Sequence, residues 1–356
     1  MNKSESDQPT VIFGPFIGEF GWEIMHWMGW VNQMSMTKYS SYKKIVISYP
    51  GRSVLYPYAD KFIELPKWFL DLKPSARNYI LDGWLEGYPG TSAEKYVWDF
   101  RYGLHRILRF RRPHKVLLEK PYAWTSMKPN AELVLTEILE HHVISNYTLI
   151  CPWKLSTFET EKFGFNDSGI SKYLSLESNI YRFPNPIELW SKLNSTKTGK
   201  LMVSQQNPNK QNLITIFPRR RTIRREDKNW GQQNYVTIVE KLQRKYPNHK
   251  ICICGEPTGA YFAEGVPKDC IDLVNIEPRN RLDAHIAALE NSDIAFGSLS
   301  GAMFLPLMTK TPTLVFGLES EKARFERDNY LGTQLTYLPV KNPSVELIME
   351  EIGKII

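Results

Sequence analysis

The sequence predicts an α/β protein with two domains, each built on a mostly parallel sheet. Strand and helix signals alternate in two separate blocks of the chain, which is the pattern of parallel strands joined by helices. The chain has 356 residues, which is more than a single hydrophobic core usually contains. Because 42% of the residues are hydrophobic and 13% are aromatic, we expect a folded, globular protein.

The first block shows the weaker alternation. Its expected elements are a strand at 10–14, a helix at 22–35, and strands at 43–49 and 146–153. Aromatic and basic residues without a clear period fill the stretch from about 65 to 145, so no element is assigned there.

The second block alternates more regularly, and its first helix carries Tyr235, Ile238 and Leu242 at helical spacing. The expected strands are 213–218, 250–255, 271–276, 293–298 and 313–317, and the expected helices are 233–245, 281–291, 301–310 and 344–356.

The two blocks predict the domain organisation. We expect an N-terminal domain at 1–190, a C-terminal domain at 213–340 and a terminal helix at 341–356 that can cross back to the first domain. The segment 191–212 between the blocks is polar and rich in turn-forming residues, as a linker is.

The charge balance indicates the kind of partner. Lysine and arginine outnumber aspartate and glutamate by 45 to 38, which gives a net charge of +7. This surplus favours anionic partners such as phosphates, nucleic acid or acidic glycans, and it is equally compatible with a mildly basic soluble enzyme.

Targeting signals are not evident in the sequence. The first ten residues lack the basic and apolar parts of a secretory signal, and no apolar run has the length of a membrane span. We therefore expect a cytoplasmic protein, in the host cytoplasm if a virus encodes it. Peripheral contact with a membrane stays open.

The sequence favours neither a disulfide framework nor a metal site. The cysteines show no Cys-x-x-Cys spacing, so we expect buried structural thiols at Cys151, Cys252, Cys254 and Cys270. The chain contains no Asp-x-Asp sequence and no histidine cluster with ligand spacing. We therefore expect no metal ion.

The segment "LDAHIAALENSDIAFGSLSGAMFLPLMTKTPTLVFG" (282–317) resembles the donor-binding half of glycosyltransferases with two facing Rossmann-like domains, the GT-B type. It is most similar to the heptosyltransferase family. The resemblance implies transfer of a sugar from a nucleotide-sugar to an acceptor hydroxyl, with inversion, without a metal and with no cofactor beyond that co-substrate. Leu299 and Phe304 depart from the family, which usually has Asp and His at these places, so the donor's identity is not implied.

The turn after the strand at 293–298 is the first candidate donor site. It leads into a helix N-terminus, where free N–H groups and the helix dipole bind a pyrophosphate. Ser298, Ser300 and Gly301 are the expected contacts. A small-residue turn needed only for tight packing is the alternative.

Two other strand ends contribute candidates for donor binding. Arg219, Arg220 and Arg221 follow the strand at 213–218, at the carboxyl edge where ligands bind in α/β sheets. Arginine is suited to neutralising the leaving diphosphate, and a solvated charge run is the alternative. Gly255 and Glu256 end the next strand in a turn that could border the nucleotide base.

The loop after the first strand, "GPFIGEFG" (14–21), is the candidate catalytic loop. In heptosyltransferases the equivalent loop carries a Gly-Asp pair whose carboxylate deprotonates the acceptor, and Gly18-Glu19 is the matching pair here. Glu19 is therefore the expected general base. Glu23, one helical turn later, is expected to orient the acceptor or to replace Glu19, and stabilising the helix dipole is the alternative.

The acceptor side is expected to include Gly18 and His26 from the same region, and Arg109, Arg111 and Arg112 from the basic and aromatic segment 98–115. A solvated amphipathic helix explains that segment equally well. The expected acceptor is anionic: a phosphorylated or acidic glycan or glycolipid, such as a lipopolysaccharide core, or DNA with a hydroxymethylated base.

Two other classes of protein stay open. Gly14, Gly18 and Gly21 approximate the Rossmann dinucleotide fingerprint with altered spacing, and Arg52 could serve an NADP-dependent oxidoreductase. A non-enzymatic nucleic-acid-binding protein would explain 98–115 and leave the donor-like C-terminal segment unexplained.

Overall fold

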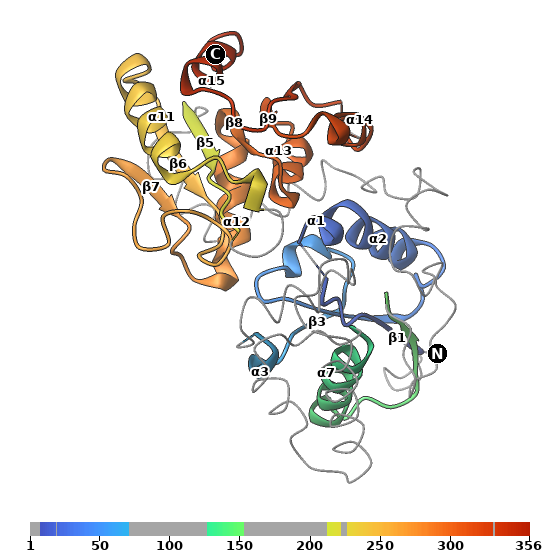
Figure 1. Ribbon diagram of the computed structural model, residues 1–356. Helices are drawn as coiled ribbons and strands as arrows, with labels where there is room; N and C mark the ends of the chain where they lie inside the picture. Colours follow the sequence, from blue (N-terminus) through green and yellow to red (C-terminus); the bar gives the residue numbers. More distant parts are fainter. Residues whose placement is uncertain (1–7, 19, 71–126, 153–211, 222–225, 330–331) are drawn as a thin grey trace, which may run out of the picture. The chain divides into compact units, whose positions relative to one another are not determined.

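The computed structural model describes residues 8–18, 20–70, 127–152, 212–221, 226–329 and 332–356. The chain divides into two compact units, residues 1–184 and 185–356, and each contains one parallel sheet (Figure 1). The predicted α/β class is therefore confirmed. The predicted linker lies outside the described residues apart from Asn212, and the separate roles of the two domains stay predictions.

The sheet of the first unit has the strand order β3-β2-β1-β4. Its strands are β1 (Thr10–Phe13), β2 (Lys43–Ser48), β3 (Lys61–Glu64) and β4 (Tyr147–Ile150). Thr10 pairs with Lys43 on one side and with Tyr147 on the other, so β1 lies in the middle of the sheet. The three predicted strands are confirmed, and β3 was not predicted.

Helices cover both faces of this sheet. They are α1 (Phe20–Trp22), the π-helix η2 (Glu23–Trp27), α2 (Met28–Met36), the 3-10 helix η3 (Ser53–Leu55), α3 (Lys67–Leu70) and α7 (Met127–His142). The segment from α1 to α2 lies on one face and α7 on the other (Figure 1). This placement follows from right-handed crossovers, because the chain moves outward from β1 to β3 and then returns to β4. The predicted helix at 22–35 is confirmed, whereas α7 was not predicted.

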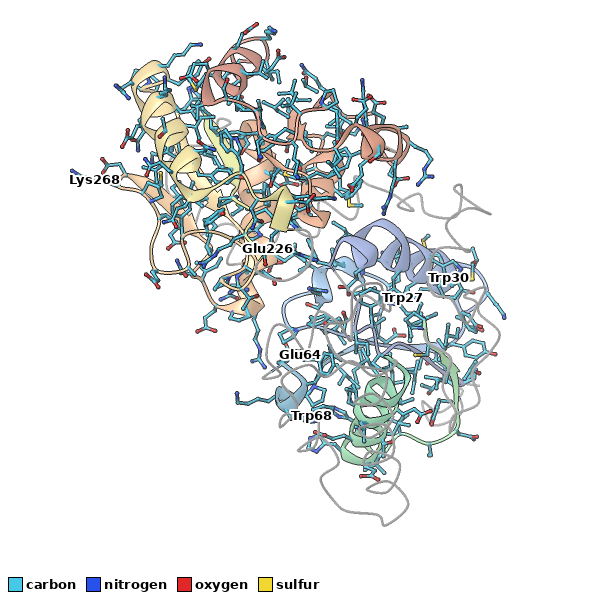
Figure 2. The ribbon with its side chains drawn as sticks, in the orientation of Figure 1. Trp27, Trp30, Glu64, Trp68, Glu226 and Lys268 are labelled. Atoms are coloured by element: carbon cyan, nitrogen blue, oxygen red, sulfur yellow. The ribbon has the colours of Figure 1, made fainter. Side chains whose placement is uncertain are left out.

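Aromatic side chains pack the helix after β1 onto its own loop. The rings of Phe16 and Trp27 stack with centroids 6.0 Å apart. Those of Trp27 and Trp30, both labelled in Figure 2, stack with centroids 5.8 Å apart. Trp27 and Phe16 are almost completely buried. The loop after β1 is thus part of the first core.

The sheet of the second unit has the strand order β10-β9-β8-β5-β6-β7, and all its strands are parallel. The strands are β5 (Leu213–Phe217), β6 (Lys250–Cys254), β7 (Cys270–Leu273), β8 (Ser292–Ser298), β9 (Thr313–Phe316) and β10 (Leu335–Leu338). From β5 the chain winds outward to β7 and then returns to β8 on the other side of β5. The order therefore reverses between β5 and β8, and in such sheets ligands bind at the carboxyl ends of the strands at this switch point.

The helices of the second unit form two layers. They are η4 (Glu226–Lys228), α11 (Gln232–Lys245), α12 (Pro278–Glu290), η5 (Gly301–Met303), α13 (Phe304–Met308), α14 (Glu319–Arg327) and α15 (Val345–Ile352). Helix α11 packs on α15, and α12 packs on α13. The predicted elements of this block are confirmed with small shifts at their ends, and α14 and β10 were not predicted.

The terminal helix α15 uses its apolar face within the second unit. Val345, Ile348 and Ile352 join the same core as Tyr235 and Ile238 of α11. The expected crossing of this helix to the first domain stays a prediction. Among the helices of the described residues, none combines the length and the apolar character that a membrane span requires.

Candidate functional site

The carboxyl edge of the second sheet collects the predicted donor-binding residues. Arg219, Arg220 and Arg221 follow β5, Gly255 and Glu256 follow β6, and Ser298, Ser300 and Gly301 follow or end β8. Parallel neighbouring strands end at the same edge of a sheet, so the fold brings these three groups to one edge. The β5 and β8 groups flank the switch point.

The three arginines after β5 have different surroundings. Arg219 is only 7% exposed, and its Nη1 donates to Asn229 Oδ1 at 2.7 Å. Arg220 is exposed, and its guanidinium lies 5.8 Å from the centre of the Tyr261 ring. Arg221 is half-buried. Arg220 therefore presents its charge to solvent at this edge, while Arg219 is held in the loop.

The end of β8 lies very close to β5. A Cβ atom on Gly297 would lie 2.6 Å from the carbonyl oxygen of Phe217, so only glycine fits there. The next residue, Ser298, is 1% exposed, and its buried Oγ lies next to the Tyr235 hydroxyl. Ser300 precedes η5, and its side chain makes no capping hydrogen bond. The hydroxyl of Ser300 is thus available at the switch point, whereas that of Ser298 is buried.

A tyrosine of α11 contacts the end of β5 at the switch point. Tyr235 is fully buried, and its hydroxyl donates to the Phe217 carbonyl at 3.4 Å. Burial raises the pKa of Tyr235 to about 12, and hydrogen bonding with Ser298 and the positive charge of Arg219 lower it by smaller amounts. The phenol therefore stays protonated at neutral pH and acts only as a polar neighbour of the site.

The turn after β6 has a glycine where no other residue fits. Gly255 has a φ of +156°, and a Cβ atom there would lie 2.6 Å from Cβ of Ala260. Glu256 is exposed beside it. The turn is joined to β5, since Tyr261 N–H donates to the Pro218 carbonyl at 2.7 Å.

His285 of α12 lies beneath this turn and was missed by sequence reasoning. Its Nε2 lies 2.8 Å from the Leu273 carbonyl and 3.4 Å from the Gly255 nitrogen. Burial lowers the pKa of His285 to about 4, so the ring is neutral at pH 7 and donates to Leu273. The one sequence feature that could have indicated this residue was a histidine within an apolar helix, and such a histidine is more often a core residue than a functional one.

A buried polar cluster at the carboxyl edge of the first sheet joins the segment after β1 to the segment between β2 and β3. The Glu23 carboxylate is fully buried and pairs with Arg52. It also accepts hydrogen bonds from Ser48 Oγ and, at 2.6 Å, from the hydroxyl of Tyr56. Burial first, and the Glu23 charge second, raise the pKa of Tyr56 well above its usual range, so this phenol stays protonated and donates.

Arg52 lies between aromatic rings as well as beside Glu23. Its guanidinium is 4.9 Å from the centre of the Phe20 ring and 4.2 Å from that of Tyr49. The residue is 8% exposed. Glu23 therefore holds the helix after β1 to the turn after β2, with its carboxylate shielded from solvent, and its expected role toward the acceptor stays a prediction. Arg52 is likewise not an exposed partner for the 2′-phosphate of NADP.

Several predicted residues have no described side chain. Glu19 and Arg109, Arg111 and Arg112 lie outside the described residues, and His26 lies in the π-helix η2. Gly18 packs tightly, since a Cβ atom there would lie 2.6 Å from the Phe16 ring. The roles of these residues in catalysis and acceptor binding stay predictions.

The cysteines of the described residues are free thiols. Cys151, Cys252 and Cys254 are buried and Cys270 is half-buried. Burial raises the pKa of Cys252 to about 12 and that of Cys270 to about 11, so these thiols are unreactive at neutral pH. The described residues contain no group of three His, Cys, Asp or Glu side chains arranged for a metal ion.

No protein-family model matches the chain, and no curated protein matches it. Among solved structures, the chain is similar to E. coli ADP-heptose lps heptosyltransferase II, with a TM-score of 0.47, 11% identity and 98% of each chain covered. It is similar to the E. coli heptosyltransferase WaaC with ADP, with a TM-score of 0.45, 10% identity and coverage of 98% of this chain and 100% of that one.

A third similar structure is the glycosyl transferase family 9 protein from Veillonella parvula, with a TM-score of 0.40, 12% identity and coverage of 98% of this chain and 88% of that one. With TM-scores below 0.5, these structures assign no role to any residue of this chain.

Proposed function

We propose that the chain is a glycosyltransferase that binds a nucleotide-sugar at the carboxyl edge of its second sheet and transfers the sugar to a hydroxyl of an anionic acceptor. One observation carries the proposal: the strand order reverses between β5 and β8, and Arg220, Ser298 and Ser300 lie at that point. The resemblance of 282–317 to glycosyltransferases supports the choice of nucleotide-sugar over other ligands. The reaction takes place in the cytoplasm, or in the host cytoplasm if a virus encodes the chain.

In this proposal the second unit stabilises the leaving nucleoside diphosphate. The exposed guanidinium of Arg220 neutralises its charge, and the Ser300 hydroxyl donates to its oxygens. The first N–H groups of η5 add donors, because the first turn of a helix leaves them without intrahelical partners. Gly255 and Glu256 border the nucleoside. These groups perform the charge neutralisation for which other enzymes use a divalent cation.

The first unit supplies the base and the acceptor site in this proposal. The Glu19 carboxylate takes the proton of the acceptor hydroxyl, the acceptor oxygen bonds to the anomeric carbon, and the bond from that carbon to the diphosphate oxygen breaks. The sugar inverts in this single displacement. Glu23 does not react in this proposal, and it keeps the loop 14–21 in place through its contacts with Arg52 and Tyr56.

The acceptor carries negative charge in this proposal, because the chain has a net charge of +7. A phosphorylated or acidic glycan and DNA with a hydroxymethylated base both provide such a hydroxyl. Titration of the acceptor affinity against salt distinguishes them from a neutral glycan, and duplex DNA that does not bind at any salt concentration removes the nucleic-acid version.

A thermal-shift panel tests the proposed class of enzyme. ADP, GDP, UDP, NADH and NADPH are each added to the full chain with and without EDTA. We expect one nucleoside diphosphate to raise the melting temperature in both conditions, since a ligand that binds only the folded state stabilises it. Stabilisation by NADPH alone, or a strict requirement for a divalent metal, would contradict the proposal.

A further inference from the structure

The side chain of Asn229 closes the loop that carries the arginines after β5. Its Oδ1 accepts from Arg219 Nη1 at 2.7 Å and from the backbone N–H of Arg221 at 2.9 Å. Its Nδ2 donates to the carbonyl oxygen of Arg221 at 2.7 Å. One amide thus makes three of the four hydrogen bonds available to it, across eight to ten residues of chain.

Asn229 is itself held on both sides. It follows η4, which begins at Glu226 (Figure 2), and its backbone N–H donates to the Glu226 carbonyl at 2.9 Å. Lys228 pairs with the Glu321 carboxylate in the first turn of α14. Trp230 is 3% exposed, and its Nε1 donates to the Pro343 carbonyl at 2.7 Å. The amide is therefore fixed to the folded body of the second unit.

Arg220 lies between the two residues that Asn229 holds. Its own backbone N–H donates to the Gly259 carbonyl at 2.9 Å, and that of Arg219 donates to the Phe217 carbonyl at 2.9 Å. Together with the bond from Arg221 N–H to Asn229, these contacts fix the main chain at 219, 220 and 221. Its side chain is the exposed one of the three and lies at the carboxyl edge of β5. The rigid main chain limits where this guanidinium can reach.

We propose that Asn229 is a positioning residue for donor binding, which acts by holding the main chain from which Arg220 contacts the diphosphate. The inference rests on the proposed function. Its physical basis is preorganisation: a loop that is already ordered in the free protein loses less conformational entropy when the ligand binds. Asn229 has no direct contact with the donor in this proposal, and its whole effect passes through Arg220.

A double-mutant cycle tests this dependence, because it separates an effect that acts through a second residue from an independent one. Affinity for the nucleoside diphosphate that stabilises the wild type most is measured by calorimetry. The variants are Asn229→Ala, Arg220→Ala and the double variant. Asn291→Ala is the matched control, since Asn291 Nδ2 donates to the Ala287 carbonyl at 2.9 Å next to the amino end of β8.

We expect Asn229→Ala to weaken binding by about five- to tenfold in the wild-type background and by less than about twofold in the Arg220→Ala background. Asn291→Ala should bind as the wild type does. If Asn229→Ala does not fold, Asn229→Ser, which keeps one polar group, enters the same cycle.

Two outcomes overturn the inference while the proposed function stands. The first is wild-type affinity in Asn229→Ala together with lost affinity in Arg220→Ala. The second is an equal loss in both backgrounds, which would mean that Asn229 affects the unit as a whole. If no nucleoside diphosphate binds the wild type, the proposed function fails, and the inference fails with it.

Discussion

Glu23 and Arg52 form a buried ion pair that joins the helix after β1 to the turn after β2. Both residues lie at the carboxyl edge of the first sheet, and Ser48 and Tyr56 complete the hydrogen bonds of the carboxylate. Removing one member of a buried pair leaves an uncompensated charge, which is costly. The pair therefore ties the position of the proposed catalytic loop to the stability of the first core.

Replacing Glu23 with Gln should destabilise the protein strongly. The amide keeps the size of the carboxylate but leaves Arg52 without its counter-charge, at a cost of about 3 kcal/mol in the free energy of unfolding. Denaturation followed by tryptophan fluorescence measures it. The control is Asp60→Asn, which removes the charge of a half-exposed carboxylate paired with Lys44 and should cost under about 1 kcal/mol. Equal costs in the two variants would contradict a supporting role for Glu23.

Replacing Glu19 with Gln should strongly lower the rate of transfer without affecting the fold. If Glu19 is the general base, turnover falls by roughly 10²–10⁴, while donor affinity and melting temperature are unchanged. The comparison is turnover of Glu19→Gln and of Glu23→Gln, each related to the amount of folded protein. Wild-type turnover in Glu19→Gln together with an inactive but folded Glu23→Gln would make Glu23 the base.

Arg220 and Arg219 should differ when each is replaced with Ala. Arg220→Ala removes an exposed charge and should lower turnover by more than about tenfold, with little change in stability. Arg219→Ala removes a buried guanidinium bonded to Asn229 and should lower the melting temperature instead. Steady-state kinetics and thermal unfolding of both variants measure the difference, and unchanged kinetics in Arg220→Ala would return the loop to a solvated charge run.

Stability should depend on His285 between pH 6.5 and pH 4. Burial lowers its pKa to about 4 in the folded state, so in this range the unfolded chain binds a proton that the folded chain does not. Its contribution is complete above pH 6.5 and decreases as the pH falls, by about 3 kcal/mol in total.

The measurement is the difference in unfolding free energy between wild type and His285→Gln across that range. A difference is needed because Glu290 acts in the opposite direction: burial raises its pKa to about 7, so its protonation favours the folded state as the pH falls. A difference that does not change with pH would contradict the buried neutral ring.

Most helices and strands of the second unit could be predicted from the sequence, but few of its side-chain contacts could. Strands β5 to β9 were predicted because each is a short apolar run followed by a turn. Helix α7 was missed because it lies in the stretch from 65 to 145, which was left unassigned as a whole, and β3 was missed because it has only four residues with Lys61 and Glu64 at its ends. The hydrophobic pattern reports local structure, and it was clearest where strands are buried on both faces and form continuous apolar runs.

The residues of the candidate site likewise include some that the sequence predicted and some contacts that it did not. Ser298 and Arg220 were predicted because they follow strands directly, and a strand end has a known position in a parallel sheet. The partnership of Glu23 with Arg52 spans 29 residues, and that of Asn229 with Arg219 spans 10, so no local pattern indicates either. Arg52 suggested a phosphate ligand in the sequence because its buried partner was invisible there.

Hydrogen exchange with a bound nucleotide tests the central claim most directly. The full chain is labelled with deuterium in the presence and absence of the nucleoside diphosphate that stabilises it most, and protection is compared between segments. The account predicts protection at 218–221, 255–260 and 298–303, the carboxyl ends of β5, β6 and β8 in the second unit. Protection confined to the glycine-containing loop 14–21 of the first unit would place the nucleotide where a dinucleotide fingerprint binds it, and would contradict the account.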